Sequence, residues 1–425
     1  MSFRLSEPPL IEGRREWTLF LAGALFVFLL SLAWRYYEYT GFISEKKVFT
    51  DADVLIQYTK SKKGREYEVL KLHTKEGLTF YTTSKEPIKN LTGRNISLLM
   101  FPKRVTFVDY LAVPFIPSAI VRVNHERSAR MEVFEKIKEA HSHPWIRELY
   151  GALFLALPIS KELRERVTLL GVSHLLALSG FHMGLLWLIV YGTLSLFYKP
   201  LQQRYFPWRH RLMDVGAVTI FLLGNYLLFT GVPPSLLRAF VMVATGWMAL
   251  LLGVELLSFS FLAFCVVLLV ALLPSLLFSI GFWFSVAGVF FIYQFLQFAR
   301  TWPKWIVFLL LNLWVYVAML PVVHAVFGIF SLYQLLSVPL TLLFSLFYPL
   351  SILLHATGFA GSLDPVVLKL LHLPSDAKSI ELFTPLWALA LFLFLGVAAV
   401  RWRIALYLQA GFALFFFLLL VKQVA

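Results

Sequence analysis

Residues 171–197 read GVSHLLALSGFHMGLLWLIVYGTLSLF, and this stretch contains no Lys, Arg, Asp or Glu. The hydrocarbon core of a bilayer is about 30 Å thick, so about 20 apolar residues in a helix can cross it. This stretch is long and apolar enough to do so. Further apolar runs follow it almost without interruption, which predicts a protein that is embedded in a membrane.

The composition supports this prediction. Apolar residues make up 59% of the chain and charged residues 15%, with a mean hydropathy of +0.75, whereas soluble domains are about half apolar and about a quarter charged. The single cysteine, Cys265, excludes an internal disulfide and a thiolate-bound metal cluster within the chain. We therefore expect a polytopic α-helical membrane protein without a cofactor or a metal.

The apolar runs predict where the chain crosses the membrane. The first run, Trp17–Trp34, lacks a small-x-small cleavage site and is predicted to be an uncleaved anchor. Later spans are expected at 172–197, 212–230, 235–252, 257–273, 276–298, 305–325, 331–357, 383–400 and 404–421. This pattern predicts a multi-pass protein of the cytoplasmic (inner) membrane.

Charge predicts the orientation of these spans, because Lys and Arg concentrate in cytoplasmic loops. The loop 199–211 is basic and has no acidic residue, so it and the N-terminus are predicted to be cytoplasmic. Strict alternation would then place Arg401 and Arg403 outside. We therefore expect 331–357, which carries two prolines, to form a hairpin or two half-helices, as broken helices do where they line a cavity.

Residues 41–123 differ from the rest of the chain. Short β-prone stretches alternate with turn residues, at 48–58, 66–72, 78–83, 95–101 and 105–110. Five short strands in a segment of this size predict a small inserted β-barrel, similar to the oligonucleotide/oligosaccharide-binding (OB) fold. The chain thus divides into a tail with the first helix (1–40), the OB-like domain (41–123), amphipathic interfacial helices (124–170) and a polytopic domain (171–425).

The inserted domain is basic, with 14 Lys and Arg against 8 Asp and Glu. Such a surface suits a polyanion or lipid headgroups, and exposed aromatic rings can stack on bases. The candidate DNA contacts are Lys62, Lys63, Arg65, Tyr67 and Tyr81. A solvated basic surface and tyrosines that pair across strands are the plainer interpretation.

The polar residues of the opening stretch are costly at membrane depth, which marks them as candidates for function. If 172–197 is one helix, His174, Ser179 and His182 spread over about 140° of its circumference. Gly180 and Gly184 then lie on the other side, where a neighbouring helix could pack closely.

The stretch Gly171–Gly184 resembles the signature of the ComEC family of competence proteins, which typically reads G-L-S-H-L-L-A-I-S-G-L-H-h-G, with h apolar. A second family pattern, P-S-h-h-R-A-h-h-M, is similar to Pro234–Met242 and includes Arg238. A third is similar to Gly281–Val286, which includes Ser285, and a fourth to the segment around Gln334. Trp283 and Gln334 depart from the glutamine and asparagine that are usual in these two patterns.

The resemblance implies a channel that passes single-stranded DNA into the cytoplasm during natural transformation. The DNA path would then include His174, Ser179, His182, Arg238, Ser285 and Gln334, with Gly180, Gly184 and Gly281 at helix contacts. The implied partners are single-stranded DNA, membrane lipid, an extracytoplasmic DNA receptor and cytoplasmic DNA-translocating or DNA-binding proteins. A homo-oligomer is compatible with such a channel.

No enzymatic activity is expected from this resemblance. Long family members carry a metallo-β-lactamase-like domain with an H-x-H-x-D-H zinc site, whereas the only H-x-H here is His141-Ser-His143. No G-x-x-x-x-G-K-[ST] loop is present, so energy would come from a partner. Two alternatives remain open: a secondary transporter of another solute, and an intramembrane serine hydrolase with Ser179 as nucleophile and His324 or His355 as base.

Overall fold

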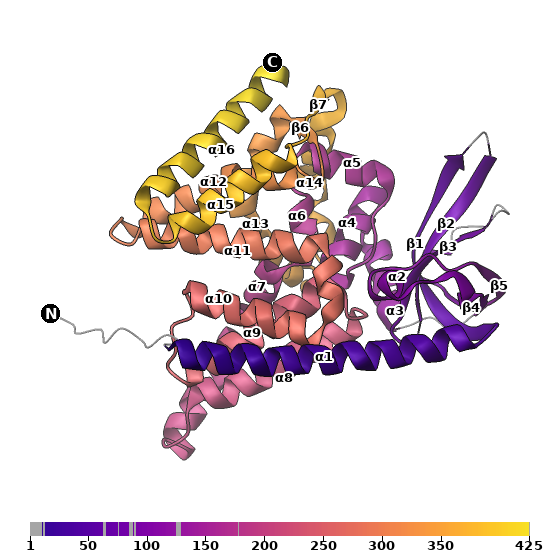
Figure 1. Ribbon diagram of the computed structural model, residues 1–425, viewed down its shortest axis with the longest axis horizontal. Coiled ribbons are helices and arrows are strands. Elements are labelled where there is room, and N and C mark those ends of the chain that lie inside the picture. The colour runs from indigo at the N-terminus through magenta and orange to yellow at the C-terminus, as the bar shows by residue number, and fades with distance from the viewer. Residues whose placement is uncertain are drawn as a thin grey trace.

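The computed structural model describes residues 11, 13–62, 65–74, 76–84, 88, 91–124, 129–176 and 178–424. It contains a small antiparallel sheet near the N-terminus and many apolar helices. In Figure 1 the sheet lies at the far end of the first helix, away from the N-terminus and beyond the other helices.

Helix α1 (Arg14–Ser44) extends well past the predicted anchor Trp17–Trp34. None of its side chains is buried, and Phe20 stacks on Phe264 with ring centroids 4.7 Å apart. At its other end, the Tyr39 hydroxyl donates to the Val105 carbonyl at 2.9 Å. The helix therefore joins the sheet domain to the apolar helices, with an exposed apolar surface that suits lipid.

The sheet contains β1 (Val48–Lys62), β2 (Arg65–Thr74), β3 (Thr79–Ser84), β4 (Asn95–Met100) and β5 (Ser118–Val123), in the order β3-β2-β1-β4-β5. All ladders are antiparallel. Alternate side chains point to one face and form an apolar core of Ala52, Val54, Leu70, Leu72, Phe80, Ile96 and Leu98.

Two details differ from the prediction for 41–123. The segment 105–110 is not a strand, because Thr106 caps a short helix, α2 (Phe107–Leu111), through the Asp109 amide; the fifth strand is β5. Among the described residues the ladders form an open sheet, so the predicted closed OB-like barrel is not observed. A single parallel bridge, Tyr81 to Phe115, links β3 to the segment before β5.

Three short helices follow the sheet: α3 (Ala129–Ala140), α4 (Pro144–Leu155) and α5 (Lys161–Leu169). They pack with α6 (Ser173–Leu176), α13 (Ser337–Thr357) and α14 (Asp364–His372). The shared core includes Ile146, Tyr150, Leu163, Leu175, Phe344, Tyr348 and Leu371. The amphipathic segment is thus tied by apolar burial to residues about two hundred positions later in the chain.

The apolar helices confirm a membrane protein. Within the described residues, seven helices are long and apolar enough to cross a bilayer: α1, α7 (Gly180–Tyr205), α8 (Arg211–Phe229), α11 (Ile280–Phe298), α12 (Lys304–Val323), the segment Leu332–Thr357 and α16 (Arg403–Val424). Three shorter apolar helices accompany them: α9 (Pro234–Leu251), α10 (Phe259–Leu272) and α15 (Leu386–Ala399).

The expected break within 331–357 is wrong. A short 3-10 helix, Leu332–Leu336, leads directly into α13, which continues to Thr357 with Pro349 inside it. Pro339 lies in the first turn, where a missing backbone N–H breaks no helical hydrogen bond.

A strand pair explains the charge pattern without a broken helix. Strand β6 (Ile329–Ser331) pairs with β7 (Ser379–Glu381), so the segment 332–378 between them begins and ends at the same place in the fold. The end of α12 and the start of α15 therefore lie near each other. At the other end of α15, Gln294 near the end of α11 donates to the Gly396 carbonyl at 3.3 Å. Arg300 and Arg401, which follow α11 and α15, therefore lie on one side.

Candidate functional site

The stretch that resembles the family signature is not the single helix predicted for 172–197. Helix α6 ends at Leu176, and α7 begins at Gly180. Ser179 between them is extended, with φ −127° and ψ 178°. The break arises because Ser179 takes the N-cap position, which requires non-helical backbone angles. The predicted 140° arrangement of His174, Ser179 and His182 is therefore wrong.

Gly171 makes the turn before α6. Its φ is +70°, which a residue with a side chain rarely adopts. A Cβ here would lie 3.1 Å from the Cβ atoms of both Gln334 and Ser337. The signature thus packs backbone to backbone against the start of α13.

Gln334 holds this contact together. Its side chain is buried, and its amide Nε2 donates to the carbonyls of Thr168 at 3.2 Å and Ile329 at 3.1 Å. Because its partners are backbone carbonyls in the last turn of α5 and in β6, this buried amide fixes these two elements relative to each other.

A row of accessible polar groups lies beside this junction, and we call Thr168, Ser173, His174 and Thr341 the polar strip. The Thr168 and Ser173 hydroxyl oxygens lie 3.1 Å apart. His174 donates from Nδ1 to the Gly171 carbonyl at 3.1 Å, and its Nε2 lies 3.2 Å from the Thr341 hydroxyl. Ser173 and His174 are exposed, and the two threonines are half-buried.

His182 has a different environment. It is fully buried, and its Nδ1 accepts from the Ser179 amide at 3.3 Å and the Ser179 hydroxyl at 3.1 Å. The rings of Phe344 and Tyr348 lie 5.0 and 4.9 Å away. Its Nε2 has no partner within the described part of the chain. The ring completes the cap of α7 and faces the protein interior.

The predicted glycine contacts are also different. A Cβ at Gly180 or Gly184 would meet nothing within 4 Å among the described residues, so no helix packs closely on them. A Cβ at Gly281 would lie 3.7 Å from the Arg238 guanidinium. Gly281 thus leaves room for an arginine and not for a neighbouring helix.

Arg238 lies apart from the polar strip. It is only 7% exposed; Nη2 donates to the Gly281 carbonyl at 3.1 Å and Nη1 to the Ser279 hydroxyl at 3.4 Å. Its Nε has no partner within the described residues. Ser285 lines the same small apolar cavity, of about 10 Å³, which is room for about one water molecule. A phosphate would reach this site only after the helices move.

The predicted contacts of the sheet domain are partly described. Tyr67 and Tyr81 are half-buried, and Lys71 lies over the Tyr81 ring, with Nζ 5.7 Å from its centroid. Partial burial lowers the pKa of Lys71 and raises that of Tyr81. Lys63 lies outside the described residues, as do the side chains of Lys62 and Arg65.

The structure therefore groups the candidates into separate places. His174, Ser179 and His182 lie within the signature, and Gln334 packs against it. Arg238 and Ser285 line the small cavity, and the two tyrosines belong to the sheet. Sequence reasoning missed Thr168 and Thr341, whose role depends on contacts across the fold. The described residues include no group of three or more His, Cys, Asp or Glu suited to a metal ion.

Comparison with known proteins agrees with the resemblance noted in the sequence. A family model described as competence protein matches residues 158–424, which is more than half of the chain. No curated protein and no solved structure matches. The matched range includes α5, the signature, the polar strip and Arg238. The chain therefore belongs to the ComEC-type family of competence proteins.

Proposed function

We propose that this protein is a channel of the cytoplasmic membrane that passes single-stranded DNA inward during natural transformation. The family points to DNA uptake, and the helices provide a membrane-embedded body. The observation that carries the proposal is the polar strip: accessible hydroxyl and imidazole groups lie on the family signature, next to apolar helices. Polar groups in such a setting mark substrate paths.

His174 and the hydroxyl groups beside it offer hydrogen bonds to a polyanion. The Gly171 carbonyl can only accept, so Nδ1 of His174 carries the proton of the neutral ring. Desolvation lowers the pKa of His174, which favours this neutral form. The Thr341 hydroxyl oxygen lies 3.2 Å from Nε2 of His174 and 2.7 Å from the Ser337 carbonyl. Hydroxyl groups beside a neutral ring can exchange hydrogen bonds with passing phosphates without holding one in place.

The sheet domain would receive the DNA. Its strand order and the Tyr81–Phe115 bridge agree with an OB-like arrangement in which β3 approaches β5, and OB folds bind single strands through grooves and stacked aromatic rings. A receptor outside and a motor or DNA-binding protein inside would complete the path, because the chain has no nucleotide-binding loop of its own.

We expect the full-length protein in detergent to bind a fluorescent single-stranded oligonucleotide, with an affinity that falls steeply with salt. In a plot of the logarithm of the association constant against the logarithm of the salt concentration, each phosphate contact contributes about −0.7 to the slope. Changing both Lys62→Glu and Lys63→Glu should weaken binding and flatten this slope. The matched pair Lys46→Glu and Lys47→Glu, at the end of α1 near the start of β1, should do so less. Equal losses in the two pairs, or no binding at low salt, would contradict this role.

The proposed orientation can be tested by cysteine labelling. In a Cys265→Ser background, a membrane-impermeant maleimide added to intact cells should modify Lys60→Cys and Ser362→Cys. It should not modify Gln203→Cys or Trp402→Cys, which lie in the loops predicted to be cytoplasmic. All four positions are exposed, so disruption of the cells should make all of them reactive. Labelling of Gln203→Cys in intact cells would overturn the orientation.

One contact favours a second candidate, an intramembrane hydrolase. The Ser179 hydroxyl lies 3.1 Å from His182 Nδ1, which is the spacing of a nucleophile and its base. The bases predicted from sequence have other partners: His324 binds the Leu382 carbonyl, and His355 binds His141. Covalent labelling of Ser179 by a fluorophosphonate would support the hydrolase, and its absence would leave the capping role.

A further inference from the structure

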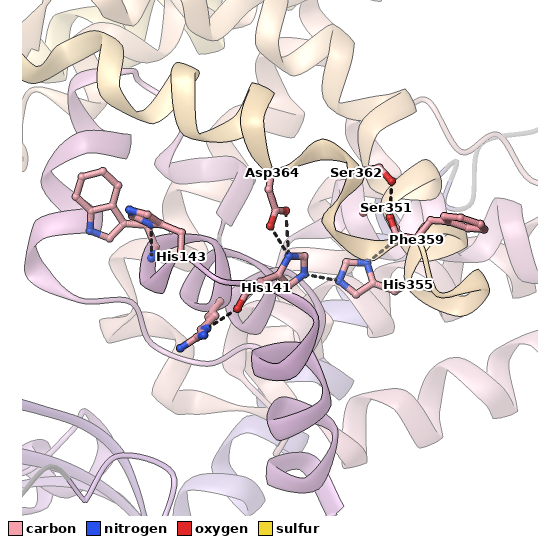
Figure 2. Close-up of polar contacts among 9 residues, drawn as sticks. His141, His143, Ser351, His355, Phe359, Ser362 and Asp364 are labelled. Atoms are coloured by element: carbon pink, nitrogen blue, oxygen red, sulfur yellow. Dashed lines mark hydrogen bonds and ion pairs between the residues drawn. The ribbon is translucent and has the colours of Figure 1, made fainter.

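A second histidine cluster lies outside the signature. His141, in the turn between α3 and α4, is between Asp364 and His355 (Figure 2). Its Nδ1 lies 2.9 Å from both carboxylate oxygens of Asp364, and its Nε2 lies 3.1 Å from Nε2 of His355. Nδ1 of His355 faces the Ser351 carbonyl at 2.7 Å.

These contacts require more protons than two neutral imidazoles carry. A carbonyl can only accept, so His355 Nδ1 must hold a proton, and His141 Nδ1 shares one with the carboxylate. The two Nε2 atoms also need a proton between them, because two lone pairs at this distance repel. The three contacts therefore need three protons, whereas two neutral imidazole rings carry only two.

We propose that His141, His355 and Asp364 form a proton-binding site that joins α4, α13 and α14. The added proton lies between the two Nε2 atoms, and the Asp364 carboxylate balances its charge. The site connects residues 214 and 223 positions apart in the chain. Loss of the proton on raising the pH removes the bond between the two rings and loosens this junction.

The surroundings suit a positive pair. The Tyr150 ring from α4 stacks on His141, with centroids 4.6 Å apart and planes 18° apart, and it lies 4.6 Å from His355. Aromatic faces stabilise a nearby cation. Helix α4 carries two charged groups, and neither binds a ring of the cluster. Arg147 donates from Nε to the His141 backbone carbonyl at 2.7 Å, and Glu148 accepts from the Ser160 amide at 2.8 Å. Asp364 is the ion partner that α14 contributes.

Thermal melting of the purified full-length protein, followed by tryptophan fluorescence between pH 5.5 and 8.5, tests the site. His355→Gln keeps a neutral donor towards His141 but cannot hold the extra proton. Compared with this variant, the wild type should melt about 3 °C or more higher at acidic pH, and the difference should vanish as the pH rises. His372→Gln, an exposed histidine on the same helix α14, should keep the wild-type profile.

Asp364→Asn provides a second test that does not depend on replacing a ring. Without the counter-charge the proton should bind more weakly, so the transition should move to lower pH. Identical pH profiles for the wild type and His355→Gln would overturn the proposal. Stoichiometric metal that co-purifies with the wild type and is lost in His141→Gln would also overturn it, because the cation would then be a metal ion.

Discussion

Gly171→Ala is expected to lower the stability of the folded protein by about 2 kcal/mol or more. A residue with a Cβ pays roughly 1–2 kcal/mol to adopt a left-handed backbone, and Gly171 has a φ of +70°. The new Cβ would also lie 3.1 Å from Gln334 and Ser337, where packing is already tight. The melting temperature of the purified protein in detergent should therefore be lower than that of the wild type by about 4 °C or more.

The matched control is Gly180→Ala, nine positions later in the same signature. Its Cβ would point into open space, and its backbone is helical. Alanine favours a helix over glycine by about 1 kcal/mol, so stability should be unchanged or slightly higher. If Gly180→Ala is the more damaging of the two, the description of this junction is wrong.

Much of the fold follows from the sequence alone. Apolar runs predicted α8 to α12, α15 and α16 to within a few residues, because only helices satisfy their own backbone in a bilayer. They also predicted α1 and α7, but α1 extends further and α7 begins and ends later than predicted. The turn residues of 41–123 predicted four of the five strands. The fifth strand was misplaced because Thr106 and Asp109 form a capping box that converts the β-prone segment into a short helix.

Other features depended on contacts between distant residues. The helical pattern of 172–197 continues through Ser179, so the break could be recognised only from the cap that Ser179 and His182 make. Likewise, the positive-inside rule detected that 331–357 is unusual. The pairing of β6 with β7 accounts for the position of Arg401 without a broken helix. Each of these strands has only three residues, which is too short for an alternating pattern to be recognised in the sequence.

The candidate site shows the same division. The signature directed attention to His174, which is exposed, and to His182, which is buried. Thr341 could not be selected from sequence, because a lone threonine in an apolar helix usually bonds to its own backbone. It does so here with Ser337, and its oxygen also lies 3.2 Å from Nε2 of His174, a contact that only the folded chain brings about.

His174→Ala is expected to reduce DNA entry at least about tenfold while leaving the protein folded. A hydrogen bond to a charged group contributes about 1.5–3 kcal/mol, and about 1.4 kcal/mol corresponds to a factor of ten. The ring is exposed, so its removal leaves no buried cavity. His372→Ala, an exposed histidine away from the polar strip, is the matched control and should transport normally.

Uptake of labelled DNA by whole cells tests whether this protein carries single-stranded DNA across the membrane. Cells in which the gene is deleted receive the wild type, His174→Ala or His372→Ala, and labelled DNA is then followed separately as bound outside and as nuclease-protected inside. We predict that deletion abolishes the inside fraction, that the wild type and His372→Ala restore it, and that His174→Ala restores about a tenth or less at equal protein level. An undiminished inside fraction in the deletion strain would show that this protein does not carry the DNA.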